Sequence, residues 1–298
     1  MSDFPFEGTF TALVTPMRDD AERSLDLEAL ERLVEQQIAG GIDGLVPCGT
    51  TGEAATLSHD EWATVVKETI RIARGRVPVI AGTGSNSTAK TIATTRAAKE
   101  LGVDAALVVT PYYNKPSQAG LRAHYEAVLD AVAIPVVLYN VPGRTACNMT
   151  AETTAALASH PNVAAVKEAS GNLEQVQAII ERTEGRFAVL SGDDALAVPM
   201  YAVGGRGVIS VVSNPAPART AALYRDFRAG KIDAAAQGQV VLRTLIAALF
   251  CESNPQPAKA AMHLLGLMQP TVRLPLLTAS PQAREQVRGA LQDLGMLG

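Results

Sequence analysis

The sequence predicts an α/β protein, a (β/α)8 barrel (TIM barrel) with a C-terminal helical extension, on three observations. Eight short apolar runs with strand character alternate with segments of helical periodicity. The runs recur about every 28 residues, close to the repeat length of such a barrel. They show little polar alternation, which is typical of parallel strands covered on both faces. An open doubly wound sheet has units of similar length, but the eight runs and the lack of a dinucleotide-binding fingerprint favour the barrel.

The expected strands cover residues 9–15, 44–47, 77–81, 105–109, 135–139, 163–167, 187–190 and 207–210. Helices are expected between them. Apolar residues recur at helical spacing over 30–38, and Gly40 and Gly41 end that helix. Ser58 and Glu61 have the spacing of a capping box, which predicts the start of the next helix.

The last part of the chain has a different character. Residues 231–298 are rich in alanine and leucine, with breaks at 254–257 and 274–275, which predicts about three further helices. We therefore expect a catalytic barrel over residues 1–230 and a helical appendage over 231–298 that packs on it. Because no low-complexity linker separates the two parts, they are expected to form a single structural domain.

Composition excludes several classes of function. The 298 residues are 47% hydrophobic, and 26 basic against 30 acidic residues give a net charge of −4. This balance does not favour a nucleic-acid partner or a membrane surface. Apolar runs such as 105–109 and 134–138 are too short to span a bilayer, and the N-terminus lacks signal-peptide features. Three cysteines without metal or disulfide spacing indicate a reducing, cytoplasmic location.

Lys167 is the first candidate for chemistry. It ends the apolar run 163–167, and a lysine on a buried strand is costly unless it is paired or neutral. A neutral, desolvated amine is a nucleophile that forms Schiff bases with ketones. The ordinary alternative is a lysine that extends its amine to water. Glu168 is not the expected partner, since adjacent strand residues point to opposite faces.

Other polar residues follow the expected strands, where barrels carry their active groups. Thr50 and Thr51 lie in a glycine loop whose hydroxyl and N–H groups could hold a small carboxylate, although an ordinary capped turn has the same residues. Tyr139 ends the fifth strand and could move protons beside the lysine, or be a half-buried aromatic residue. Arg144 could bind a carboxylate, or be a solvated loop residue.

Together these segments form a pattern that extends through the chain, and the chain resembles the dihydrodipicolinate synthase family of class I pyruvate aldolases. The segments that carry the resemblance are Gly49-Thr50-Thr51-Gly52-Glu53, Thr110-Pro111-Tyr112-Tyr113-Asn114, Tyr139-Asn140-Val141-Pro142-Gly143-Arg144-Thr145, Lys167-Glu168-Ala169-Ser170-Gly171-Asn172 and Ser191-Gly192-Asp193-Asp194. Lys167 alone would not be specific, whereas the full set in this order is.

The resemblance implies a role for each matching residue on the pyruvate side. Lys167 forms an imine with the ketone of pyruvate, and the imine tautomerises to an enamine. Thr51, together with Thr50, holds the pyruvate carboxylate. Thr50, Tyr139 and Tyr113 form a proton relay, and the residue matching Tyr113 reaches across from a neighbouring subunit in the family.

The resemblance also implies which residues bind the second substrate and how the subunits assemble. Arg144 matches the group that binds the carboxylate of aspartate semialdehyde, and Gly192 and Ile209 match residues beside the lysine. The product would be 4-hydroxy-tetrahydrodipicolinate, on the diaminopimelate route to lysine. The family's chemistry proceeds through the imine on Lys167 and needs no metal or nucleotide. The family also implies a homotetramer, a dimer of dimers.

Two alternative functions stay open at this point. One is a Schiff-base pyruvate aldolase that acts on a sugar acid, either N-acetylneuraminate or a 2-keto-3-deoxy sugar acid. Those enzymes share the lysine and the tyrosine but typically lack an arginine like Arg144, so Arg144 favours aspartate semialdehyde. The other is a non-catalytic barrel that binds a keto acid, which the full set of hydroxyl, phenol and amine groups makes the weaker hypothesis.

One departure from the family pattern concerns regulation. Members that lysine inhibits bind it at a dimer interface, and Ala55, His59, Asn86 and Tyr112 fall at matching positions of this possible effector site. Where those members carry a glutamate, this chain has Lys90. A cation there would repel the ammonium group of lysine, so we expect weak inhibition or none.

Overall fold

A computed structural model describes residues 6–297. The chain separates into two compact units. Unit 1 contains Val79–Ile209 and the segment that ends at Gly8, and unit 2 contains Thr9–Pro78 and the residues from Ser210 onward.

The sheet confirms the predicted fold class. Its eight strands are β1 (Gly8–Ala12), β2 (Gly44–Val46), β3 (Ile80–Gly82), β4 (Ala105–Val109), β5 (Val136–Asn140), β6 (Val163–Glu168), β7 (Ala188–Ser191) and β8 (Gly207–Ser210). They are hydrogen-bonded in the order β2-β1-β8-β7-β6-β5-β4-β3, and the registers recorded within each unit are parallel. Apart from β2 and β3, which stand at the two ends of this order, neighbours in the sequence are neighbours in the sheet. This is the order of a (β/α)8 barrel and not of a doubly wound sheet.

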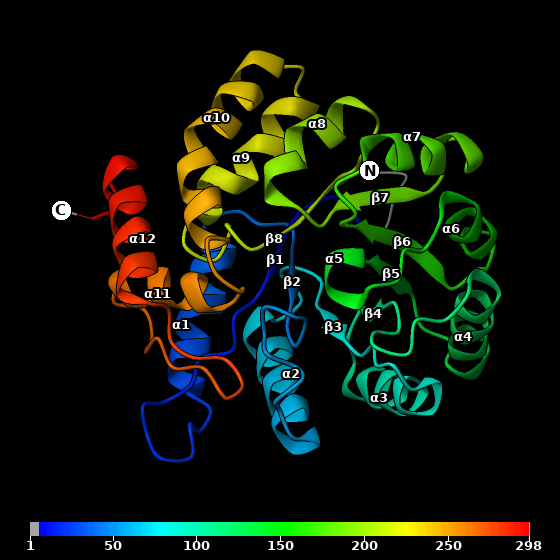
Figure 1. Cartoon of the computed structure of the whole chain (residues 1–298), viewed down its shortest axis with the longest axis horizontal. Coiled ribbons are helices and arrows are strands. Elements are labelled where there is room, and N and C mark those ends of the chain that lie inside the picture. The colour runs from blue at the N-terminus through cyan, green and yellow to red at the C-terminus, as the bar shows by residue number, and fades with distance from the viewer. Residues whose placement is uncertain (1–5, 298) are drawn as a thin grey trace. The chain divides into compact units, whose positions relative to one another are not determined.

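Unit 1 contains the strands β3 to β7, most of β8, and their helices. The helices α3 (Thr88–Leu101), α4 (Gln118–Ala131), α6 (Ala151–Ala158) and α7 (Leu173–Arg182) flank the strands β4 to β7 (Figure 1). Shorter turns of helix follow β5 and β7: α5 (Pro142–Thr145), the 3-10 turn η1 (Asp194–Leu196) and α8 (Ala197–Ala202). The strands are buried almost throughout, as their apolar sequences predict.

Unit 2 contains β1, β2 and the C-terminal helices. Its helices are α1 (Leu27–Ala39), α2 (His59–Ala73), α9 (Pro217–Arg228), α10 (Ile232–Leu249), α11 (Gln256–Leu264) and α12 (Pro281–Asp293). The three helices predicted after residue 231 are present. Gly40 caps α1, and Ser58 and Glu61 form the predicted capping box of α2.

Most strand ends lie within one residue of the prediction, and two differ from it by three residues, because a side chain replaces the neighbouring strand. β1 ends at Ala12, and not at Thr15, since the N–H of Val14 donates to Asn214 Oδ1 at 3.1 Å. β3 begins at Ile80, and not at residue 77, since the N–H of Val79 donates to Asp104 Oδ2 at 2.8 Å. Periodicity does not reveal side chains that replace ladder hydrogen bonds.

Helix α10 is the one described helix that is long and apolar enough to cross a membrane by length and composition. Polar residues interrupt its sequence, so it contains no apolar run of membrane-spanning length. About 33% of it is buried, and it packs against α9 and α12 within unit 2. We interpret α10 as part of the helical extension that the sequence predicts.

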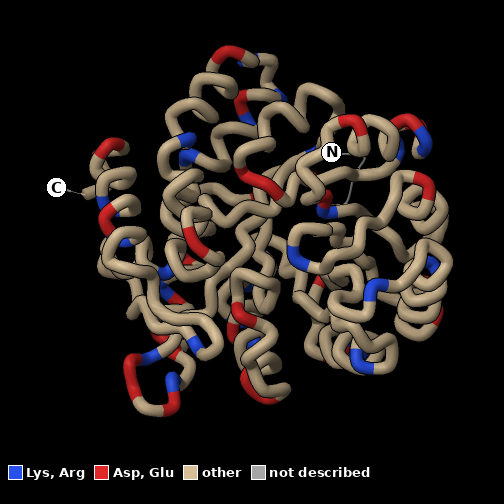
Figure 2. The backbone as a smooth tube through the Cα atoms, in the orientation of Figure 1, with Lys and Arg blue, Asp and Glu red and all other residues tan. Residues whose placement is uncertain are grey.

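Charged residues of both signs are interspersed along the chain. In Figure 2, Lys and Arg alternate with Asp and Glu over short stretches of the tube, without a long run of one sign. Several of these charges form pairs, within one helix as Arg122 does with Glu126, or between distant segments as Arg76 does with Glu35.

Candidate active site

Lys167 lies at the carboxyl end of β6, and the strand pairing places it beside Tyr139 of β5. Both side chains are buried, with 6% of each residue exposed. The amine Nζ lies 4.4 Å from the centroid of the Tyr139 ring. The lysine therefore does not extend into water as the ordinary alternative expected. Its amine lies over the ring of Tyr139, so the ends of β5 and β6 bring these two residues together.

Gly192 follows β7 and makes room for this lysine. A Cβ atom added at Gly192 would lie 3.0 Å from Lys167 Cε, 3.1 Å from Lys167 Cγ and 2.7 Å from the Cβ of Ala169. Real Cβ atoms essentially never approach other atoms to less than 3.0 Å. A side chain at position 192 would displace Ala169, whose Cβ lies below that limit, and would crowd the aliphatic part of Lys167 by a few tenths of an ångström.

Glu168 faces away from this arrangement, as predicted, and it has partners of its own. Its buried carboxylate accepts hydrogen bonds from Asn140 Nδ2 at 3.0 Å, from Gln175 Nε2 at 3.1 Å and from the N–H of Ser170 at 2.7 Å. Asn140 also receives the N–H of Met149 on its Oδ1 at 2.9 Å. This network connects the ends of β5 and β6 to the residues after α5, and sequence reasoning did not assign it a role.

Of the residues of unit 1 assigned to catalysis or substrate binding, Arg144 and Tyr113 are exposed. Arg144 lies on α5, directly after β5. Among residues 6–297 it forms no ion pair, so its guanidinium group can receive a ligand carboxylate. Tyr113 has 89% of its surface exposed and a φ of 73°, a conformation that is uncommon for a bulky side chain.

The threonine loop, residues 49–53, belongs to unit 2. Thr50 is exposed, whereas Thr51 is buried and accepts a hydrogen bond on Oγ1 from Asn254 Nδ2 at 2.9 Å. The N–H groups of Gly52 and Glu53 bond back to the carbonyls of Gly49 and Thr50.

The turn limits how this loop can bind an anion. Helix α2 begins at His59, after the predicted cap at Ser58, so the loop does not open directly into a helix. Since the N–H groups of Gly52 and Glu53 are used inside the turn, an anion at this loop depends more on the threonine hydroxyls than on a row of N–H groups.

The remaining predicted residues have these positions. Ile209 is buried in β8 of unit 1. Of the effector candidates, Asn86, Lys90 and Tyr112 belong to unit 1, and Lys90 is exposed on α3. Ala55 and His59 are exposed residues of unit 2, and His59 stacks on Trp62 with a centroid distance of 5.7 Å.

The fold and the buried lysine define a class of protein: a (β/α)8 barrel with an amine at the strand end where barrel enzymes carry their catalytic groups. The particular family follows from comparison with known proteins. Residues 5–294 match the model of the dihydrodipicolinate synthetase family. The chain belongs to this family.

Individual relatives agree over the full length. The chain is 52% identical to the 4-hydroxy-tetrahydrodipicolinate synthase of Sorangium cellulosum (strain So ce56), covering 99% of this chain and 98% of that protein. A dihydrodipicolinate synthase of Acinetobacter baumannii, solved in complex with pyruvate, is 45% identical with a TM-score of 0.95, covering 98% of this chain and 99% of the other. One of Cyanidioschyzon merolae, solved with lysine bound, is 42% identical with a TM-score of 0.94 and the same coverage. The names of these relatives favour the predicted condensation of pyruvate with aspartate semialdehyde over the reaction of a sugar-acid aldolase.

Proposed function

We propose that this chain is a lyase that condenses pyruvate with L-aspartate 4-semialdehyde to give 4-hydroxy-tetrahydrodipicolinate. Family membership over nearly the whole chain carries this proposal. The buried amine of Lys167 beside Tyr139 and over Gly192 supports it, since the reaction needs a desolvated nucleophile with a proton donor next to it.

The pyruvate half of the reaction begins at Lys167. Its Nζ attacks the ketone carbon of pyruvate, and the carbinolamine loses water to give an imine. Loss of a methyl proton converts the imine to an enamine. We assign the phenol of Tyr139, whose ring lies against the amine, as a proton carrier, with Thr50 and Tyr113 as the further members of the relay. Thr51 and Thr50 are proposed to hold the pyruvate carboxylate by their hydroxyl groups.

The second half uses the enamine as a carbon nucleophile. It attacks the aldehyde of aspartate semialdehyde, whose carboxylate we assign to Arg144. The amine of that substrate then displaces Lys167 as the ring closes, which frees the enzyme. We assign Gly192 and Ile209 to the surroundings of Lys167 during these steps.

The proposal has consequences for cofactors, assembly and location. The imine itself withdraws electrons from the methyl carbon, so the chemistry needs no metal or nucleotide. The exposed ring of Tyr113 suits a residue that acts in a neighbouring subunit, and we propose a cytoplasmic homotetramer, a dimer of dimers. Its partners are small molecules, without nucleic acid or membrane. Sedimentation should then give about four times the chain mass of 31.2 kDa, whereas a monomer at assay concentrations would contradict the assembly.

A coupled assay tests the activity. The purified protein should consume pyruvate and aspartate semialdehyde together, with a product that a reductase for 4-hydroxy-tetrahydrodipicolinate accepts. Lys167→Ala should abolish turnover. Turnover of N-acetylneuraminate or a keto-deoxy sugar acid, without turnover of aspartate semialdehyde, would contradict the proposal.

A further inference from the structure

The C-terminal extension reaches the threonine loop through Asn254. This residue lies between α10 and α11, 203 positions from Thr51, and its side-chain amide donates to Thr51 Oγ1 at 2.9 Å in a buried contact. From this geometry we infer that Asn254 is a positioning residue that sets the direction of the Thr51 hydroxyl toward the carboxylate of pyruvate. The inference rests on the proposed role of Thr51.

The direction of this hydrogen bond leaves the proton of the Thr51 hydroxyl available. A hydroxyl group has one proton and two lone pairs, so an oxygen that accepts from Asn254 keeps its proton for another acceptor. Within residues 6–297 of the structure, no side chain or carbonyl accepts that proton. A carboxylate is an acceptor only, and it therefore complements the hydroxyl that Asn254 leaves in this state.

Asn254 destabilises the fold at this position through its side-chain oxygen. Its Oδ1 is buried and has no hydrogen-bond donor among the described residues. A buried acceptor without a partner destabilises the fold, and an apolar side chain would avoid that cost. A role for the Nδ2 donor explains why an amide stands here.

Other residues of the C-terminal extension hold the same loop in place. Lys259 of α11 forms a fully buried ion pair with Glu53 at 2.5 Å, and its Nζ donates to the carbonyl of Thr271 at 2.7 Å. Glu53 has a φ of 55°, a strained conformation that needs such support.

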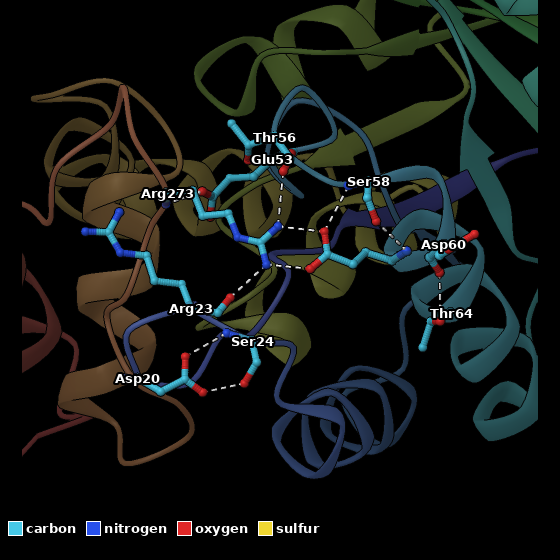
Figure 3. A network of polar contacts seen from close by, with 10 residues as sticks. Asp20, Arg23, Ser24, Glu53, Thr56, Ser58, Asp60, Thr64 and Arg273 are labelled. Carbon is cyan, nitrogen blue, oxygen red and sulfur yellow. Dashed lines mark hydrogen bonds and ion pairs between the residues drawn. The ribbon is translucent and has the colours of Figure 1, made fainter.

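Arg273 adds contacts to Glu53 and to the residues that follow the loop. Its backbone N–H donates to Glu53 Oε2 at 3.1 Å, and its guanidinium donates to the carbonyl of Thr56 (Figure 3). The guanidinium also donates to Glu61. The loop is therefore held at several points, and a hydrogen bond to Thr51 can fix a single hydroxyl direction on it.

The test compares ketones with and without a carboxylate. Borohydride trapping at Lys167 is measured against concentration of pyruvate and of acetone for wild type, Asn254→Ala, Asn254→Asp, Thr51→Val and Asn254→Ala/Thr51→Val. The half-saturating pyruvate concentration should rise about fivefold in Asn254→Ala, the loss expected for one hydrogen bond. It should rise at least as much in Asn254→Asp, which accepts the Thr51 proton. Trapping with acetone should not change, and Asn254→Ala should add nothing once Thr51 is valine.

Three results would overturn the inference: unchanged pyruvate dependence in both Asn254 variants, equal losses with acetone, or losses of Asn254→Ala and Thr51→Val that multiply. If Asn254→Ala does not fold, Asn254→Asp, which keeps the side-chain shape, carries the comparison. A wild-type protein that traps no pyruvate would contradict the proposed function, and this outcome is distinguishable because it does not depend on any Asn254 variant.

Discussion

The position of the Lys167 side chain depends on Gly192, a residue that has no side chain of its own. The aliphatic part of the lysine occupies the space that a Cβ at Gly192 would need, and its amine lies against the Tyr139 ring. The position of the nucleophile is thus determined by sterics on one side and by an aromatic face on the other. Each of these contacts can be changed separately.

Gly192→Ala should slow imine formation. The added methyl group would clash with Ala169 and crowd the side chain of Lys167, and misplacements of up to about 1 Å can cost up to about 100-fold in rate. We expect a fall of about 10- to 100-fold in the trapping rate with pyruvate, and the same fall in turnover. Gly289→Ala, where a Cβ meets nothing within 4 Å, is the matched control. A Gly192→Ala enzyme as fast as this control would show that the contact with Lys167 does not matter.

Arg144→Ala should separate the two halves of the reaction. Because we assign Arg144 to the second substrate, the Lys167 adduct with pyruvate should form as in wild type. Turnover with aspartate semialdehyde should fall by about 100-fold or more, as expected for a lost charge-assisted contact of about 3 kcal/mol. Parallel trapping and coupled assays measure the two effects. Equal losses in both assays would remove Arg144 from its assigned role.

At the scale of elements, α2 and the loop before α12 are joined by Arg273 and Glu61. The guanidinium group binds both carboxylate oxygens of Glu61, at 2.7 and 2.5 Å. The hydrogen bond from Arg273 is the main reason that the pKa of Glu61 falls from 4.5 to about 2. Because the folded-state pKa is the lower one, this pair stabilises the fold above about pH 4.5 and loses its effect as the pH falls toward 2.

Glu61→Gln should therefore lower the free energy of unfolding at neutral pH by about 1 to 2 kcal/mol, and the difference from wild type should shrink as the pH falls toward 2. The glutamine keeps an oxygen for the capping box. Thermal or urea unfolding at several pH values measures the difference. Glu126→Gln, at an exposed pair with Arg122, should change stability little at any pH. A Glu61→Gln difference that is constant with pH would refute the assignment.

The helices and strands were largely predictable from the sequence. The residues at which some strands end, and the contacts between distant side chains that hold the site, were not. Apolar runs locate all eight strands, because a parallel strand covered on both faces has to be apolar. The ends of β1 and β3 depend on Asn214 and Asp104, whose side chains come from distant segments. The steric need for Gly192 and the bond from Asn254 to Thr51 likewise join distant positions, and a periodic pattern carries no such information. The boundary at residue 230 within one structural domain stays a prediction.

At the scale of the whole molecule, the open question is control by the end product. A relative from Cyanidioschyzon merolae was solved with lysine bound. Lys90 of this chain is exposed at the start of α3. The resemblance predicts a glutamate at this position in lysine-inhibited members. Two ammonium groups at this position repel each other, which opposes binding of the effector.

We expect L-lysine at sub-millimolar concentration to leave the activity of wild type nearly unchanged, and Lys90→Glu to make the enzyme more sensitive to lysine. Inhibition curves in the coupled assay measure both. Lys99→Glu, an exposed lysine at the other end of the same helix, controls for the change in net charge. Strong inhibition of wild type would refute the hypothesis.

The central claim is that Lys167 forms an imine with pyruvate, and reductive trapping tests it most directly. The protein is treated with pyruvate and borohydride, digested, and analysed by mass spectrometry. The account predicts one pyruvate-derived adduct per chain, on the peptide that contains Lys167, together with loss of activity that requires both reagents. An active enzyme without an adduct, or an adduct on another lysine such as the buried Lys259, would contradict it.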